Sequence, residues 1–146
     1  MSKYGGIRET VVLLTIFGIP AGCATMGNDL VANDAVKIEK VGSARGTIGP
    51  VRAIQEGEEV ALSGEVRRRP FGRGPIPGFI DLEVLNPQGD VLEQCVIDYD
   101  RPSPNARYAN FHAVLEVAPP TGSTIRVRHD PHVASADEQD RCDGAL

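Results

Sequence analysis

The chain has 146 residues, a formal net charge of −5 and no tryptophan. Its length suits a single domain with a short leader, and such a domain can bury a core of Val, Ile and Leu side chains. The acidic balance argues against nucleic acid as the main partner, because binding to a phosphate backbone relies on clustered basic residues.

The first 23 residues follow the order of an export signal. Lys3 and Arg8 come first, an apolar run over residues 11–19 follows, and small residues lead to Cys23. The run is about half of the ~20 residues that a membrane-spanning helix needs. The pattern therefore predicts a leader that is removed rather than a permanent span.

Residues 19–23, Ile-Pro-Ala-Gly-Cys, resemble the lipobox of a bacterial lipoprotein precursor, with Pro20 where that family usually has Leu. The resemblance implies that residues 1–22 are a signal peptide and that Cys23 carries a lipid such as palmitate. In that family, Ala24 after the cysteine implies the outer membrane, with the protein facing the periplasm. Plain secretion after cleavage is the alternative.

Residues 23–35 are small and polar after the cysteine and show little periodicity. We interpret them as a lipidated tether that holds a folded domain off the membrane. An ordered first strand around Leu30 and Val31 is the alternative.

From residue 36 to residue 134 the chain has the pattern of a β domain. Apolar and polar residues alternate in short runs, and turn residues separate the runs, most clearly at residues 86–90. This spacing predicts an all-β, antiparallel β-sandwich. The expected strands cover residues 36–41, 50–54, 59–68, 79–85, 91–99, 108–117 and 124–128.

Residues 78–92 combine an alternating run, the turn Pro-Gln-Gly-Asp and a second apolar start. This segment resembles the central hairpin of immunoglobulin-like bacterial modules. The resemblance covers fifteen residues and implies a fold class, not an activity.

Two cysteines follow Cys23. Because the periplasm is oxidising, Cys95 and Cys142 are candidates for one disulfide that would fix the C-terminal tail to a strand. A buried free thiol at Cys95, which shares the phase of Val91 and Ile97, is the alternative.

His129 and His132 lie three residues apart, just beyond the last expected strand. Imidazole nitrogens bind copper or zinc, and a third ligand would come from His112, Asp137 or Cys142. Ordinary solvated loop histidines are the alternative, and they leave the protein without a cofactor.

A second candidate site is a loop rich in proline and glycine that follows residue 66. Guanidinium groups suit phosphates and carboxylates, and Phe71 and Ile76 would add apolar anchors. The alternative is a solvated loop with surface ion pairs. The candidate binding residues are Arg67, Arg68, Arg69, Phe71 and Arg73. Residues 135–146, with acidic residues at 137, 138 and 140, are interpreted as an acidic C-terminal tail.

These patterns predict a non-enzymatic envelope lipoprotein. It would be held to the membrane by its lipid, and its sandwich would bind another protein or an anionic cell-wall or lipid component. A periplasmic module that binds copper or zinc at His129 and His132 is the alternative. A hydrolase is least supported, because the sequence has no Gly-x-Ser-x-Gly and Ser63 lacks a matched His–Asp context.

Overall fold

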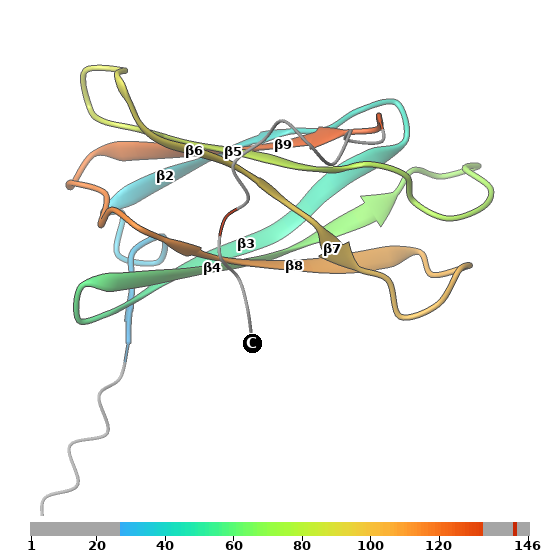
Figure 1. The fold of residues 1–146 in the computed structure, drawn as a ribbon, viewed down its shortest axis with the longest axis horizontal. Coiled ribbons are helices and arrows are strands. Elements are labelled where there is room, and N and C mark those ends of the chain that lie inside the picture. Colours follow the sequence, from blue (N-terminus) through green and yellow to red (C-terminus); the bar gives the residue numbers. More distant parts are fainter. Residues whose placement is uncertain (1–26, 133–141, 143–146) are drawn as a thin grey trace, which may run out of the picture.

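The structure is a computed structural model that describes residues 27–132 and residue 142. The regular structure of these residues is all β-strand, and they contain no helix long and apolar enough to cross a bilayer. Two sheets pack face to face (Figure 1), which confirms the predicted β-sandwich. The expected signal peptide, Cys23 and most of the acidic tail lie outside the described residues.

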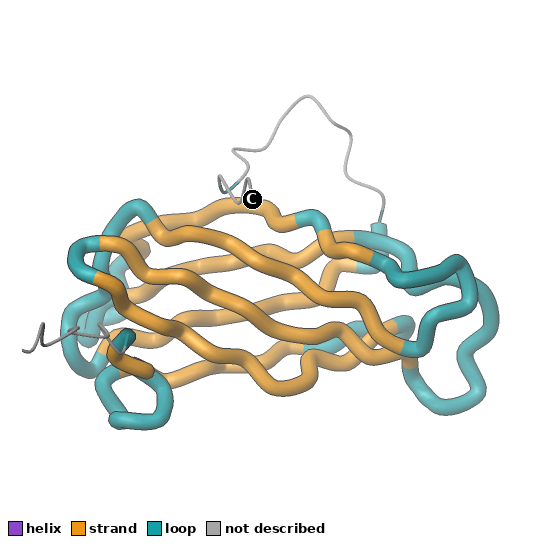
Figure 2. Tube along the Cα trace, turned by 90° about the horizontal axis from the view of Figure 1, so that it is seen from below, coloured by secondary structure: helices purple, strands orange, loops and turns teal. Residues whose placement is uncertain are grey.

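The first sheet has five strands in the order β1-β3-β4-β8-β7. They are β1 (Asn28–Asp29), β3 (Gly46–Glu56), β4 (Glu59–Arg68), β8 (Tyr108–Leu115) and β7 (Tyr99–Asp100). The second sheet has four strands in the order β2-β9-β5-β6. They are β2 (Val36–Val41), β9 (Ser123–Asp130), β5 (Phe79–Leu85) and β6 (Val91–Ile97). The strands run lengthwise and the loops gather at the two ends (Figure 2).

One pair departs from the antiparallel prediction, because β2 runs parallel to β9, with Val36 opposite Ser123. The short segment between β1 and β2 carries the chain from the first sheet to the second, so β2 starts at the end where β9 also starts. The strand order also differs from that of an immunoglobulin domain, in which the last two strands share a sheet. Here β8 and β9 lie in different sheets.

The tether predicted over residues 23–35 is corrected for its described part. Residues 28 and 29 pair with β3, Leu30 is only 5% exposed, and the Val36 amide donates to the Leu30 carbonyl at 3.1 Å. Leu30 is an apolar side chain that gains by burial against the core. Residues 27–35 therefore belong to the sandwich, close to the alternative of an ordered first strand.

The core consists of the inward positions of both sheets. Strand β8 shows the alternation most clearly, because Ala109, Phe111 and Ala113 are buried between exposed neighbours. Gly64 lies opposite Phe111 in the adjacent strand, and a Cβ atom at Gly64 would overlap the Phe111 ring. The missing side chain at residue 64 therefore makes room for the largest fully buried side chain of the core.

The hairpin predicted over residues 78–92 is confirmed as β5-turn-β6. The Asn86 side chain accepts hydrogen bonds from the amides of Gln88 and Asp90, at 2.9 and 2.8 Å, and Gly89 has a φ of 92°. These interactions fix the turn, and the turn sets the pairing of β5 with β6.

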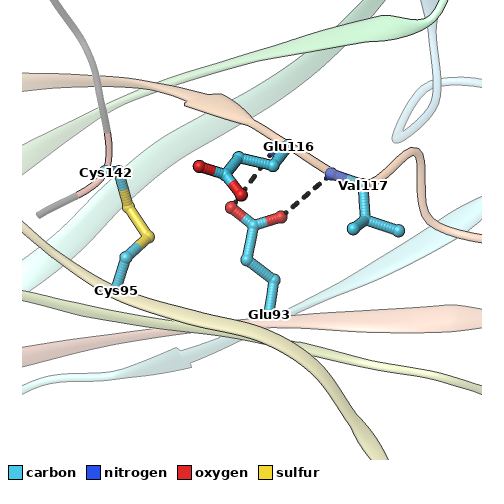
Figure 3. The surroundings of a disulfide bond; sticks show 5 residues. All are labelled: Glu93, Cys95, Glu116, Val117 and Cys142. Carbon is cyan, nitrogen blue, oxygen red and sulfur yellow. Dashed lines mark hydrogen bonds between the residues drawn. A yellow bond between two sulfur atoms is a disulfide. The ribbon is translucent and has the colours of Figure 1, made fainter. Parts of the chain in front are cut away.

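A disulfide joins Cys95 of β6 to Cys142, as predicted, with the two Cα atoms 5.3 Å apart (Figure 3). The Cys142 amide also donates to the Val96 carbonyl at 3.3 Å. Nearby, the Glu93 carboxylate accepts hydrogen bonds from the amides of Glu116 and Val117, both at 3.2 Å. These contacts link β6 to the C-terminal region and to the end of β8.

Candidate functional site

Three loops meet at one end of the sandwich (Figure 1): residues 42–45, 69–78 and 101–107. The last residue of β4 and these loops place the five arginines named next at this end, which we call the arginine end; Arg101, also in the third loop, instead donates to the Ile76 carbonyl at 2.9 Å. These five arginines are Arg45, Arg68, Arg69, Arg73 and Arg107. The Arg68 amide donates to the Arg107 carbonyl at 2.8 Å, so the end of β4 is tied to the loop before β8.

A hollow of about 620 Å³ opens at the arginine end. Its lining contains four arginines and no carboxylate, in a chain whose net charge is −5. The lining residues are Arg68, Arg69, Pro70, Phe71, Gly72, Arg73 and Arg107. An adjoining hollow of about 340 Å³ adds Arg45 and Pro77. Clustered positive charge without a carboxylate suits an anionic group.

Two of the arginines hold the loop in place. Arg68 Nη1 donates to the Gly74 carbonyl at 2.7 Å, and Arg69 Nε donates to the Ser43 carbonyl at 2.8 Å. Each bond uses one N–H of a guanidinium that has five. Arg68 and Arg69 therefore position the loop and still have donors for a ligand.

The other three of these five arginines do not hold a loop in place through their side chains. Arg45, Arg73 and Arg107 make no side-chain hydrogen bond or ion pair with the described part of the chain. Elsewhere, Arg126 contacts Glu39 and Glu83, and Arg128 contacts Asp81. Within residues 27–132 and residue 142, the guanidinium groups at the arginine end thus lack the carboxylate partners found elsewhere on the surface.

Phe71 has an unusual conformation at the rim of the hollow. Its side chain is 103% exposed and its φ is 68°, a left-handed value rarely adopted by bulky residues. Strained backbone of this kind concentrates at functional sites. An exposed aromatic ring beside four arginines offers apolar contact to a ligand held by its charge. The prediction of a second apolar anchor at Ile76 is wrong, because this side chain is 2% exposed and packs in the core.

Arg67 does not belong with the other four predicted residues of the loop. It alternates out of the core on β4 and forms an ion pair with Glu65 on the same face, and it does not line the hollow. Arg45 and Arg107, in contrast, were missed by sequence reasoning. Each lies in a different loop from the predicted arginines, so only the fold brings it to this end.

The prediction of solvated loop histidines is wrong for His129. It lies within β9, which extends to Asp130, and it is 2% exposed. Its side chain continues the inward phase of Ile125 and Val127, and this alternation was the signal that sequence reasoning overlooked. His132 is exposed, in the loop that follows.

His129 connects the loops beneath the arginine end. Its Nδ1 lies 2.7 Å from Ser43 Oγ, and its Nε2 lies 3.0 Å from the Pro77 carbonyl and 3.2 Å from Tyr99 Oη. A carbonyl only accepts, so Nε2 carries the proton toward Pro77 and Nδ1 accepts from the Ser43 hydroxyl. Tyr99 Oη itself donates to the Pro77 carbonyl at 2.6 Å.

The hydrogen bonds of His129 compete with the predicted role of His129 and His132 as metal ligands. Both ring nitrogens of His129 already have hydrogen-bond partners inside the protein, and His132 is exposed. The described residues contain no group of three or more His, Cys, Asp or Glu side chains placed to hold a metal ion. His112, one of the suggested third ligands, lies on an exposed position of β8.

The structure also places His112 opposite Ser63 in the neighbouring strand. Both residues line a shallow hollow on the outer face of the first sheet, together with Arg52, Glu65 and Asn110. No hydrogen bond joins Ser63 to His112. A serine nucleophile needs a base within hydrogen-bond reach, so this pair lacks the contact that activates one.

We expect the domain to lose stability as the pH falls below about 6.5, the ordinary pKa of histidine. Burial lowers the pKa of His129 in the folded protein, so the unfolded chain takes up the proton first. The stability is therefore complete above that pH and declines as the pH falls through the lower pKa of the folded state. Urea unfolding between about pH 7.5 and about pH 5 measures the slope.

The exposed neighbour supplies the control for this experiment. His132→Gln should keep the slope, whereas His129→Gln should flatten it. An unchanged slope in His129→Gln would show that another group causes the pH dependence.

Comparison with family models, curated proteins and solved structures finds no match to this chain. The interpretation of the site therefore rests on its own residues and geometry.

Proposed function

We propose that this chain is a non-enzymatic lipoprotein of the bacterial cell envelope that binds an anionic envelope component at its arginine end. The observation that carries the binding role is the hollow lined by four arginines and no carboxylate in an acidic chain. The exposed, strained Phe71 at its rim supports the same role. Three arginines without partners in the described part of the chain are available to a ligand.

The order of the first 23 residues supports the envelope location. The basic start, the short apolar run and Cys23 after two small residues are typical of a lipoprotein precursor. A lipid on Cys23 would serve as the hydrophobic anchor, and Ala24 favours the outer membrane facing the periplasm.

We expect Cys23→Ala to release the protein from membranes, because the anchor depends on the lipid at this residue. Fractionation of cells that express the wild type or the variant, with mass spectrometry of the N-terminal peptide, measures the effect. Wild-type protein that fractionates as soluble and shows no mass increment at Cys23 would contradict the lipoprotein proposal.

We expect Arg73→Glu/Arg107→Glu to weaken binding to anionic envelope fractions and to leave the free energy of unfolding within about 0.5 kcal/mol of the wild type. These two side chains are better targets than Arg68 and Arg69, whose hydrogen bonds hold the loop. Added salt should weaken wild-type binding in the same direction, because exposed charges are screened. Co-sedimentation at low and high salt measures both effects.

Lys37→Glu/Lys40→Glu is the matched control, since it changes the net charge equally at exposed positions of β2. It should bind like the wild type. Equal, salt-insensitive binding by all three proteins would assign the arginines to an ordinary solvated surface.

A further inference from the structure

The described chain starts at the opposite end of the sandwich from the arginine end. Asn28 pairs with Gln55, near the end of β3, whereas Gly46 at the start of β3 lies opposite Arg68. Figure 1 shows β1 and the β4–β5 loop at opposite ends of the molecule. At about 3.3 Å per residue, the length of β3 between these points is about 30 Å.

The connection between Cys23 and this end is short. Four residue steps separate Cys23 from Gly27, and a chain of that length spans at most about 14 Å even when fully extended. A lipid on Cys23 would therefore hold the end that contains β1 close to the membrane. The arginine end lies roughly twice that reach away along the strands.

The surface of the domain favours this end-on placement over one in which the second sheet lies flat on the bilayer. The outer face of the second sheet carries arginines already paired with carboxylates, Arg126 with Glu83 and Arg128 with Asp81. These two arginines are neutralised, so the attraction of an anionic bilayer to that face is limited to the exposed lysines of β2, Lys37 and Lys40. The end near β1 instead exposes Val91 and Val117.

We infer that the arginine end points away from the membrane that holds the lipid, and that its occupant is a cell-wall polymer bearing peptide carboxylates. This inference rests on the proposed function and narrows its ligand. Lipid head groups of the anchoring membrane lie on the opposite side of the domain. Guanidinium groups bind carboxylates through paired hydrogen bonds, and a polymer presents such groups repeatedly.

The side chains that line the site favour a polymer over an acidic protein. A protein interface of standard size buries about 800 Å² on each partner and has several anchoring side chains clustered in a desolvated centre. Among the described residues the large apolar side chains exposed at this end are Phe71 and Tyr108, and the hollow between the loops is lined mainly by arginine. Such a lining matches small anionic groups better than a broad protein surface.

The orientation is tested with single tryptophans, because the chain has none. Phe71→Trp reports on the arginine end and Val91→Trp on the opposite end; both native side chains are exposed. The full lipidated protein is placed in vesicles that contain dansyl-labelled lipid head groups. We expect energy transfer from residue 91 to be several-fold greater than from residue 71, since transfer falls steeply with distance.

A flexible Gly/Ser insertion of about 20 residues before Gly27 should reduce this difference, because a longer linker frees the domain to turn. Equal transfer from residues 71 and 91 in the protein without the insertion would overturn the orientation. The binding role of the arginines would survive that result, so the two failures are distinguishable.

The ligand is tested by co-sedimentation with purified cell-wall sacculi. We expect binding by the wild type, binding at least about tenfold weaker by Arg73→Glu/Arg107→Glu, and a similar loss when the carboxylates of the sacculi are amidated. Lys37→Glu/Lys40→Glu is again the control. Binding that survives amidation would overturn the carboxylate assignment.

Two other outcomes would overturn the choice of partner. Arginine-dependent binding to anionic vesicles but not to sacculi would identify lipid head groups. Absence of binding to sacculi, together with arginine-dependent capture of an acidic envelope protein, would identify a protein. In both cases the proposed binding site would stand, whereas equal binding by the arginine variant in every assay would remove the site itself.

Discussion

We expect Leu82→Ala to lower the free energy of unfolding by about 2–5 kcal/mol. Leu82 is fully buried in β5, where β9 flanks it on one side and β6 on the other, opposite Val127 and Cys95. Truncation removes apolar area from the core and leaves a cavity among strands that are paired on both sides. Urea unfolding, followed by far-ultraviolet circular dichroism, measures the loss.

Val91→Ala is the control for this prediction. Val91 is 56% exposed at the start of β6, so its truncation should change the free energy of unfolding by about 0.5 kcal/mol or less. A near-zero loss in Leu82→Ala would contradict the assignment of the inward face of β5.

We expect Cys142→Ser to lower the free energy of unfolding by roughly 4 kcal/mol, because the disulfide closes a long loop in the unfolded chain. The two cysteines are 47 residues apart in the sequence. In the chain-entropy model, a link over this separation removes many conformations from the unfolded state and leaves the folded state unchanged. Urea unfolding with and without a reducing agent measures the effect.

The reducing agent also provides the internal control. Reduced wild type and the variant should have similar stability, and the variant should not respond to the reductant. If the reductant leaves the wild type unchanged, the disulfide does not contribute in solution.

The arginine end and the buried histidine are connected through two loops. In the loop of residues 42–45, Ser43 contacts His129 through its hydroxyl and Arg69 through its carbonyl. In the loop of residues 69–78, the Pro77 carbonyl accepts a hydrogen bond from His129. The positions of the arginines therefore depend on a network in the core. Substitutions at His129 should be judged by ligand binding as well as by stability.

Most of the strands could be predicted from local patterns in the sequence. Residues 36–41, 59–68 and 79–85 match β2, β4 and β5 at both ends, because each run largely alternates apolar with polar residues and stops at turn residues. The turn at residues 86–90 was equally predictable, since Asn86 and Gly89 supply its hydrogen bonds and its positive φ. These features depend on neighbours within a few residues.

The tertiary structure alone decided which strands pair and which loops meet. Alternation identifies an inward face but not a partner, so the parallel pairing of β2 with β9 left no local signal. The same reason explains the site: four arginines near residue 70 were visible in the sequence, but Arg67 alternates away from them. Arg45 and Arg107 join the others only because their loops close the same end of the sandwich.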